Sequence, residues 1–279
     1  MQHAIKLIRD ELAAFYPDVE LQSVSRLLIS KITGYNFTEI LVNKNTIFSE
    51  HQREILKNYL EKLKNGMPVQ YVLGETEFCG LNFKVNESVL IPRPETEELV
   101  EWIVKEAEPG SVVLDVGTGS GCIAVALKHF LPASNVYGCD IASDSLITAR
   151  ENAEKNNVRV FFFQTDILME KKSDRKYQII VSNPPYIPLQ EKEMIRPHVK
   201  NFEPGRALFV PDDDPLLFYR KIAQFALSNL IPGGKLFFEV HRDYGKACVT
   251  MLEEMSFQHV QLRKDIAGNE RMIKGRSTT

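Results

Sequence analysis

The sequence from residue 112 onward alternates short apolar runs with amphipathic helical patterns, and this order strongly restricts the possible fold. Apolar runs of about four to eight residues are typical of buried strands. Their alternation with helices predicts an α/β domain with a mostly parallel sheet that carries helices on both faces. The predicted strands are 112–114, 136–139, 160–163, 178–182, 235–240, 257–263 and 270–274, and the predicted helices include 122–131, 215–229 and 244–255.

A glycine loop follows the first predicted strand and reads Asp115-Val116-Gly117-Thr118-Gly119-Ser120-Gly121. Glycines allow the turn from strand to helix and a close approach of backbone to ligand. Nicotinamide-binding Rossmann units use similar loops, but their fingerprint is Gly-x-Gly-x-x-Gly. Asp115 suits a ligand that carries an ammonium group and would lie badly beside a pyrophosphate. We therefore predict that Asp115 and residues 117–121 bind S-adenosylmethionine.

Two more carboxylates end predicted strands and suit the nucleoside part of the same ligand. Asp140 lies where a carboxylate binds a ribose diol, a feature that both cofactor classes share. Asp166 is predicted to accept a hydrogen bond from the adenine amino group while Ile167 packs on the ring; a plain strand-end or capping role for Asp166 remains open. Because ligands bind beyond the carboxyl ends of parallel strands, we expect one crevice to collect these residues with Asp115 and Asn183.

The tetrapeptide Asn183-Pro184-Pro185-Tyr186 follows the strand predicted at 178–182. An amide or aromatic amine attacks a methyl group poorly, because its nitrogen lone pair is delocalised. The Asn183 side-chain oxygen and the Pro184 carbonyl are predicted to accept its two N–H bonds, in a geometry stiffened by proline. Tyr186 would lay its ring against the flat target group.

This tetrapeptide therefore predicts methyl transfer to a planar NH2 group. We assign catalytic roles to Asn183, Pro184 and Tyr186, and substrate binding to these three and Pro185. No general base is needed, since the alkylated nitrogen becomes acidic enough to lose its proton to water. The alternative is a Pro-Pro turn that merely ends a strand.

Composition limits the function classes. The chain has 279 residues, of which 44% are hydrophobic and 25% charged, as in ordinary soluble proteins. No apolar run approaches the roughly 18–20 residues of a membrane span, and the N-terminus lacks a signal-peptide core, so we expect a cytoplasmic protein. Four scattered cysteines and six scattered histidines predict neither a disulfide framework nor a metal site. The net charge of −3 argues against a surface devoted to nucleic acid.

The first part of the chain differs from the α/β region. Residues 1–70 repeat apolar side chains at helical spacing and predict a small helical bundle, with a helix starting near Ser49. Residues 71–92 predict a β-hairpin linker, and 93–279 the catalytic domain. Residues 92–97 open a further helix to about Glu106, either through capping alone or with an added role in closing the cofactor pocket.

With these residues in view, nearly the whole chain resembles the HemK or PrmC protein-(glutamine-N5) methyltransferases, which modify peptide-chain release factors. Among the blocks that carry the resemblance, the block from Val89 to Glu97 is more discriminating than the tetrapeptide, which DNA adenine methyltransferases share. The blocks are Pro68-Val69-Gln70-Tyr71-Val72-Leu73-Gly74, Val89-Leu90-Ile91-Pro92-Arg93-Pro94-Glu95-Thr96-Glu97, Leu114 to Gly121, Ser182 to Ile187, and Phe202-Glu203-Pro204.

The resemblance implies a class I S-adenosylmethionine-dependent methyltransferase, which is a Rossmann-like, mostly parallel seven-stranded sheet, with a small N-terminal helical bundle joined by a β-hairpin. It implies methylation of the glutamine N5 in the Gly-Gly-Gln motif of class 1 release factors, with S-adenosyl-L-homocysteine as product. Residues 117–121, Asp140 and Asn183 would contact the cofactor, and 183–186 would hold the glutamine. The helical domain would help to dock the release factor. We expect a monomer without stable nucleic-acid or membrane binding.

Two segments depart from the family pattern. Where the family has Glu-x-Gly-x-x-Gln-Gly, this chain has His241 and Tyr244 in place of the first glycine and the glutamine. The segment 209–215 lacks the glycine that is common there. These departures concern the substrate channel and lid and leave the reaction type unchanged; a base role for His241 is not required.

Three other functions stay open from the sequence. A close relative methylates a ribosomal protein instead of a release factor. A DNA or RNA adenine-N6 methyltransferase would flip its target base into the same tetrapeptide and would bind nucleic acid in a salt-dependent way. A catalytically silent adaptor would bind a translation factor and transfer no methyl group.

Overall fold

The structure of the protein, a computed structural model, describes residues 1–170 and 172–278. The chain divides into two compact units. The helical unit comprises Met1–Gly74 and Arg196–Phe202, and the sheet unit comprises Glu75–Ile195 and Glu203–Thr279. Within the described residues, no helix is both long and apolar enough to cross a membrane.

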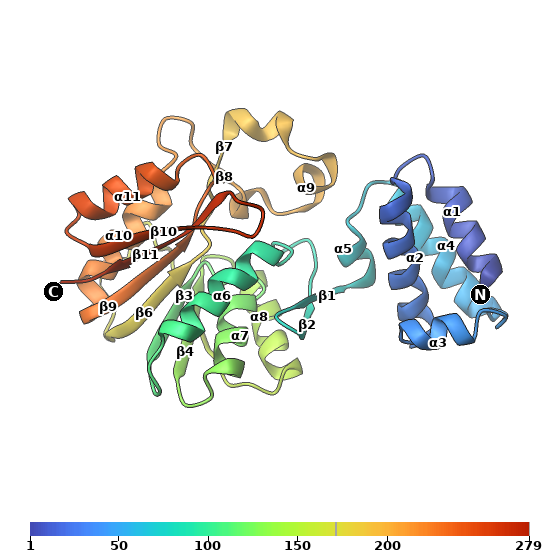
Figure 1. Ribbon diagram of the computed structural model, residues 1–279, viewed down its shortest axis with the longest axis horizontal. Helices are drawn as coiled ribbons and strands as arrows, with labels where there is room; N and C mark the ends of the chain where they lie inside the picture. The colour runs from blue at the N-terminus through green and yellow to red at the C-terminus, as the bar shows by residue number, and fades with distance from the viewer. Residues whose placement is uncertain (171, 279) are drawn as a thin grey trace. The chain divides into compact units, whose positions relative to one another are not determined.

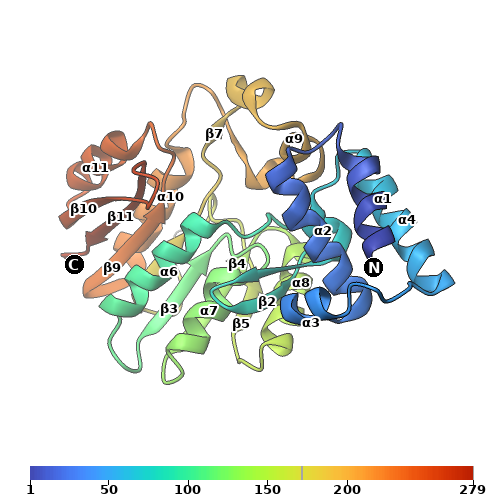
Figure 2. The same cartoon turned by 45° about the vertical axis from the view of Figure 1, so that its right-hand side comes forward.

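The helical unit confirms the predicted helical character of the first part of the chain. Helices α1, α2 and α4 pack against one another around buried side chains such as Ile8, Leu28 and Leu56 (Figure 2). Ser49 caps α4 as predicted, in a capping box with Gln52. The helices of this unit are α1 (Gln2–Leu12), α2 (Asp18–Thr33), α3 (Phe37–Val42), α4 (Glu50–Lys64), α5 (Val69–Leu73) and α9 (Pro197–Phe202).

The sheet unit contains a seven-stranded sheet in the order β10-β11-β9-β6-β3-β4-β5 (Figure 1). Strand β11 is antiparallel to β10 and β9, and the other neighbours are parallel, which confirms the predicted α/β class. The strands are β3 (Val112–Val116), β4 (Asn135–Asp140), β5 (Phe161–Gln164), β6 (Tyr177–Ser182), β9 (Leu230–Glu239), β10 (Gln258–Lys264) and β11 (Glu270–Arg276).

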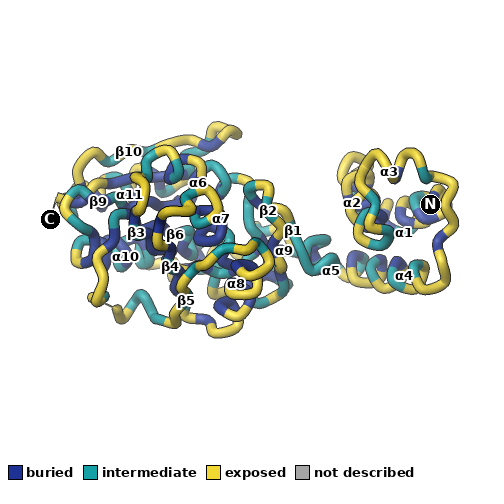
Figure 3. The backbone as a smooth tube through the Cα atoms, turned by 90° about the horizontal axis from the view of Figure 1, so that it is seen from below, coloured by how far each residue is buried: buried dark blue, intermediate teal, exposed yellow. Residues whose placement is uncertain are grey.

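Helices cover both faces of this sheet, each over its own apolar core. Alternation along a strand divides the side chains between the two cores, so that Phe237 joins one while Leu236 and Phe238 join the other. Strands β3 and β6, in the middle of the sheet, are buried over most of their length (Figure 3). Helices α6 (Pro94–Glu106), α7 (Cys122–Phe130) and α8 (Ser143–Lys155) lie on one face, and α10 (Leu217–Asn229) and α11 (Gly245–Glu254) on the other (Figure 1).

The predicted hairpin exists but is shorter than the sequence suggested. Its strands are β1 (Glu75–Phe78) and β2 (Leu81–Lys84), joined by Cys79 and Gly80, which have φ of 51° and 72°. Positive φ at both central residues is the type I′ pattern, whose twist matches that of a hairpin. The extended conformation predicted from Tyr71 onward was wrong for its first residues, because α5 runs through them and ends at Gly74, which has a left-handed φ of 72°.

Asn152 of α8 ties the hairpin to the glycine loop. Its side chain accepts from the Lys84 N–H at 2.6 Å and donates to the Lys84 and Ser120 carbonyls, both at 2.9 Å. Asn152 is fully buried, so these bonds satisfy an amide that would otherwise be costly to bury. One side chain therefore fixes β2 and the loop after β3 in a common position.

The sequence did not predict the segment between β6 and α10. It contains β7 (Ile187–Pro188), η1 (Leu189–Met194), α9, η2 (Gly205–Ala207) and β8 (Phe209–Val210). Strand β7 pairs with β8 in a separate two-stranded sheet, and the Ile187 N–H donates to the Leu208 carbonyl. Elements of two to six residues are too short to show a period, so only their non-local pairing reveals them.

Candidate active site

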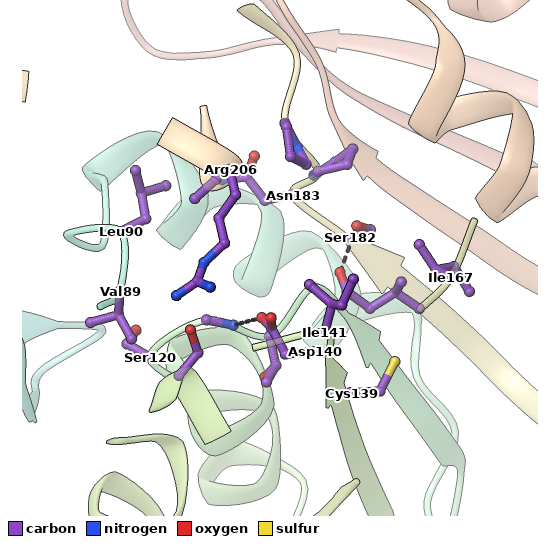
Figure 4. A pocket seen from close by; sticks show the side chains of 18 of the residues that line it. Val89, Leu90, Ser120, Cys139, Asp140, Ile141, Ile167, Ser182, Asn183 and Arg206 are labelled. Atoms are coloured by element: carbon purple, nitrogen blue, oxygen red, sulfur yellow. Dashed lines mark hydrogen bonds between the residues drawn. The ribbon is translucent and has the colours of Figure 1, made fainter. Parts of the chain in front are cut away.

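A cavity of about 270 Å³ opens at the carboxyl ends of the central parallel strands (Figure 4). Strands β4 and β6 lie on opposite sides of β3, so the crevice is at the point where the strand order reverses, as expected for an α/β sheet. Its lining includes Val89, Leu90, Pro92, Arg93, Thr96, 117–120, Asp140, Ile141, 165–168, 182–185, Arg206, Phe218 and Ile222.

The glycine loop borders this cavity, and its three glycines serve two purposes. All three have left-handed φ, of 71° at Gly117, 54° at Gly119 and 79° at Gly121. A Cβ on Gly117 or Gly119 would meet nothing within 4 Å, whereas one on Gly121 would lie 3.0 Å from the Ala149 Cβ. Gly117 and Gly119 therefore shape the turn beside open space, and Gly121 permits close packing on α8.

Asp115 lies beneath this loop and does not line the cavity. Its side chain is fully buried; Oδ2 accepts from the Thr118 hydroxyl at 2.6 Å, and Oδ1 has no hydrogen-bond partner among the described residues. Burial raises the pKa of Asp115 to about 7, against the lowering effect of the Thr118 hydroxyl. An ionised Asp115 is thus poorly compensated and would attract a cation placed at the loop.

Asp140 does line the cavity, at the end of β4. Its Oδ2 accepts from the Gly119 N–H (Figure 4) and its Oδ1 from the Ala142 N–H, both at 2.9 Å. These bonds fix the carboxylate and leave further lone pairs for a ligand, because each oxygen can accept more than one bond. The position suits a pair of ligand hydroxyls.

Asp166 and Ile167 follow β5 and line the same cavity, which is otherwise rich in apolar side chains on this side. Asp166 Oδ1 accepts from the Leu168 N–H at 2.9 Å, which is the capping contact that the sequence left open, and the ligand role of Asp166 stays a prediction. Ile141, Ile167 and Leu168 offer apolar walls. This end of the cavity can take a flat, mostly apolar ring with a polar edge.

The tetrapeptide begins directly after β6, the strand that flanks β3 on the side opposite to β4. The Ser182 hydroxyl donates to the Val116 carbonyl at 2.6 Å and ties the ends of β6 and β3 together. Asn183, Pro184 and Pro185 line the cavity, and the Asn183 Nδ2 lies 3.4 Å from the Thr96 Oγ1. Three of the four predicted residues thus share one cavity with the loop and Asp140.

Tyr186 lies behind the cavity wall and is not part of its lining. Its hydroxyl lies 3.3 Å from Glu239 Oε1, and its ring centroid lies 5.7 Å from that of His241. Burial, with Glu239 nearby, raises the pKa of Tyr186, so the phenol stays neutral and can donate. The substrate-facing role predicted for this ring remains a prediction.

His241, one of the departures from the family pattern, packs between two tyrosines. Its ring lies 5.2 Å from the Tyr244 ring, and its Nε2 lies 3.6 Å from Glu191 Oε2. Burial lowers the pKa of His241, partly offset by Glu191 and Asp243. The His241 ring lies beside the Tyr186 ring and does not line the cavity.

The block 92–97 does more than cap α6. Pro92, Arg93 and Thr96 all line the cavity, and the Arg93 guanidinium donates to Glu203 at 2.6 Å. Glu203 is buried and also accepts from the Ile91 N–H at 3.3 Å. One partly buried ion pair thus joins two blocks that stand more than a hundred residues apart in the sequence.

Sequence reasoning missed Arg206 and several apolar wall residues. Arg206 follows the block at 202–204, and Figure 4 shows its side chain extending into the cavity between Val89 and Asp140. The sequence signal that could have identified Arg206 is its position two residues after the block that ends at Pro204. Val89 and Leu90 belong to one of the sequence blocks that carry the family resemblance. Phe218 and Ile222 have the apolar character of ordinary core residues of α10, so the sequence does not mark them as cavity residues.

Comparison with protein families supports both units. The family described as methyltransferase small domain matches residues 94–206, and the PrmC N-terminal domain matches residues 3–74. A crystal structure of a methyltransferase from Pyrococcus furiosus has the same fold, with a TM-score of 0.55 at 18% identity, and the match covers 83% of this chain and 100% of that chain.

Two curated relatives match over nearly their full length. The release factor glutamine methyltransferase of Flavobacterium psychrophilum is 42% identical over 268 residues, which is 94% of either chain. That of Bacteroides thetaiotaomicron is 41% identical over 274 residues, covering 98% of this chain and 99% of the relative. The chain belongs to the family of release factor glutamine methyltransferases.

Proposed function

We propose that this protein transfers a methyl group from S-adenosylmethionine to the side-chain amide N5 of the glutamine in the Gly-Gly-Gln motif of class 1 peptide-chain release factors. One observation carries the proposal: Asn183 and Pro184 share a single cavity with the glycine loop and Asp140. Family membership supports the release factor as the substrate.

The residues around the cavity fit S-adenosylmethionine. Asp140 is held by two backbone N–H groups and suits the ribose hydroxyls, while Ile141 and Ile167 suit the two faces of adenine. The buried Asp115, with its unpaired Oδ1, supplies negative charge beneath the loop where an ammonium group would lie. The cofactor supplies an electrophilic methyl group on a sulfonium.

The tetrapeptide orients the nucleophile. Asn183 Oδ1 and the Pro184 carbonyl accept the two N–H bonds of the glutamine amide, which turns the nitrogen toward the methyl and stabilises its growing positive charge. The C–S bond breaks as the N–C bond forms, so the sulfur leaves as the neutral thioether of S-adenosyl-L-homocysteine. The methylated nitrogen then loses one proton to water, and no protein base is required.

We further propose that the helical domain, predicted at residues 1–70, docks the release factor, and that the protein acts as a monomer in the cytoplasm without stable nucleic-acid binding. The match of the PrmC N-terminal domain to residues 3–74 supports a dedicated unit in this part of the chain. Apolar side chains exposed on this unit, such as Leu41 and Val42, are available for a protein partner.

The test is mass spectrometry of a purified, unmethylated class 1 release factor after incubation with this protein and S-adenosylmethionine. We expect one added methyl group on the glutamine of Gly-Gly-Gln, and none on a release factor with that glutamine changed to alanine. Parallel reactions with ribosomal proteins and nucleic acid cover the other substrates. An unmodified release factor beside a labelled ribosomal protein or nucleic acid would overturn the proposal.

A further inference from the structure

Two buried residues connect the ends of the tetrapeptide: Thr96, which lines the cavity, and Glu239, which lies outside its lining. Thr96 lies in the first turn of α6. Its Oγ1 is 3.4 Å from the Asn183 Nδ2 and 2.6 Å from Glu239 Oε2. The other carboxylate oxygen, Oε1, lies 3.3 Å from the Tyr186 hydroxyl. Thr96 and Glu239 are only 2% and 1% exposed, so water does not compete for these bonds.

The direction of each bond follows from counting protons. A threonine hydroxyl has one proton, and an ionised carboxylate only accepts, so the short bond requires Thr96 to donate to Glu239. Thr96 can then only accept from Asn183, which places the amide NH2 toward Thr96 and Oδ1 away from it. The same carboxylate accepts from the neutral Tyr186 hydroxyl and fixes the other end of the tetrapeptide.

We propose that Thr96 and Glu239 act as a positioning pair, which sets the orientation of the Asn183 amide and of Tyr186 so that the Asn183 oxygen faces the substrate. Neither residue needs to touch the reacting atoms. The inference rests on the proposed function for its kinetic effect, and on the structure alone for the orientation of the amide.

Protonation of Glu239 would reverse the direction of the hydrogen bonds that link Glu239, Thr96 and Asn183. A protonated carboxyl can donate to Thr96, whose hydroxyl would then be free to turn toward Asn183 and favour the opposite amide orientation. Burial raises the pKa of Glu239; the Thr96 hydroxyl, the Arg271 charge on β11 and the Tyr186 hydroxyl oppose this effect, and Glu95 on α6 adds to it. Activity should therefore fall as the pH falls through the Glu239 pKa.

The first experiment reads the amide directly and needs no substrate. In protein labelled with 15N-asparagine, the side-chain NH2 signals of Asn183 are identified by their loss in Asn183→Asp. We expect Thr96→Val to shift these signals and to speed solvent exchange of one amide proton, while Thr96→Ser keeps both close to wild type. Signals that stay unchanged in Thr96→Val would overturn the positioning pair whatever the protein methylates.

The second experiment measures release-factor methylation. Outer partners of functional side chains typically contribute about tenfold or more, so we expect Thr96→Val to lower kcat about tenfold or more with little change in cofactor Kd or in KM. Thr96→Ser should restore most of kcat. Thr148→Val is the matched control, because Thr148 is an equally buried hydroxyl, bonded to Asn86 outside this site.

Glu239→Gln completes the test, because glutamine keeps the shape of the side chain and removes its titration. We expect a lower kcat and loss of the acidic limb of the kcat profile that wild type shows. If wild type methylates the release factor and the profile of Glu239→Gln keeps that limb, the pair does not control the amide. A wild type that fails to methylate would contradict the proposed function, and the amide signals would still decide the orientation.

Discussion

At the scale of single residues, the proposed reaction depends most on the Asn183 oxygen, because an amide nitrogen needs an acceptor to become nucleophilic. Asn183→Ala removes that acceptor and leaves the other residues of the cavity lining unchanged. We expect kcat to fall by about a hundredfold or more, by analogy with the loss of one oxyanion-hole donor. Cofactor Kd, measured by calorimetry, should rise only modestly. Turnover at the wild-type level in release-factor assays would contradict the acceptor role.

Asp115 links the proposed binding of the cofactor to a cost in stability. With its pKa raised from 3.8 to about 7 by burial, the folded state binds this proton more tightly than the unfolded state does. The contribution of Asp115 to the free energy of unfolding is therefore greatest below about pH 4 and declines as the pH rises to about 7. The loss is about 1.4 kcal/mol for each unit by which the folded-state pKa exceeds the unfolded-state pKa. A buried charge that is costly without its ligand is a common feature of binding sites.

Asp115→Asn separates the effect of Asp115 on cofactor binding from its effect on stability. Without cofactor, the free energy of unfolding of the variant relative to wild type should increase between pH 4 and pH 8, because asparagine does not ionise. At pH 8 the variant should bind S-adenosylmethionine more weakly. Urea unfolding at several pH values and calorimetry would measure both quantities, with the exposed Asp174→Asn as control. A stability difference that does not vary with pH would show that Asp115 does not titrate as proposed.

Residues at strand ends could be predicted from the sequence, and residues that work through distant contacts could not. Asp140 and Asn183 were foreseen because each follows an apolar run and the ends of parallel strands meet. Glu239 also ends a strand, but its bond to Thr96 spans 143 positions and has no local signal. The same holds for the pairing of Arg93 with Glu203 across 110 positions.

At the scale of elements, the contact between α7 and α8 depends on Gly121. An alanine there would keep a φ of 79° and would place its Cβ 3.0 Å from the Ala149 Cβ and 3.3 Å from the Phe162 ring. Left-handed strain and overpacking together should lower the free energy of unfolding by about 3 kcal/mol. Gly110→Ala is the matched control, since its φ is 82° and its Cβ would meet nothing within 4 Å.

The control should therefore lose only about 1 kcal/mol, from backbone strain alone. Urea unfolding of both variants would measure the difference. Equal losses would mean that α8 moves away from the loop at no cost, and that Gly121 serves the turn and not the packing.

The same elements show where sequence patterns succeed and where they fail. Strand β6 was predicted within one residue, because its apolar run is buried on both faces of the sheet. The first residues of the predicted hairpin were wrong, because Tyr71 and Val72 look like a strand while α5 buries them in a helix of a single turn. A five-residue helix is shorter than two helical repeats, so its period is not visible.

At the scale of the whole molecule, the two units carry different kinds of surface. The sheet unit holds the cavity and the residues predicted to react, whereas the helical unit exposes large apolar side chains on several helices. The sequence predicted a helical domain at 1–70, but it gave no sign that residues 196–202 also belong to that unit. Such an insertion can be recognised only from contacts such as that of Phe202 near Gly66.

If the helical unit docks the release factor, changes on its surface should affect the protein substrate and spare a short peptide. Leu41 and Val42 on α3 are 56% and 76% exposed, so changing both to serine should not disturb the fold. Because truncating an anchor residue of an interface costs more than about 1 kcal/mol, we expect the KM for a folded release factor to rise about fivefold or more. The kinetics of a short Gly-Gly-Gln peptide and the cofactor Kd should not change. Ile147→Ser on α8 makes the same kind of change on the sheet unit and should leave both substrates unaffected; an equal rise of KM for protein and peptide would place docking elsewhere.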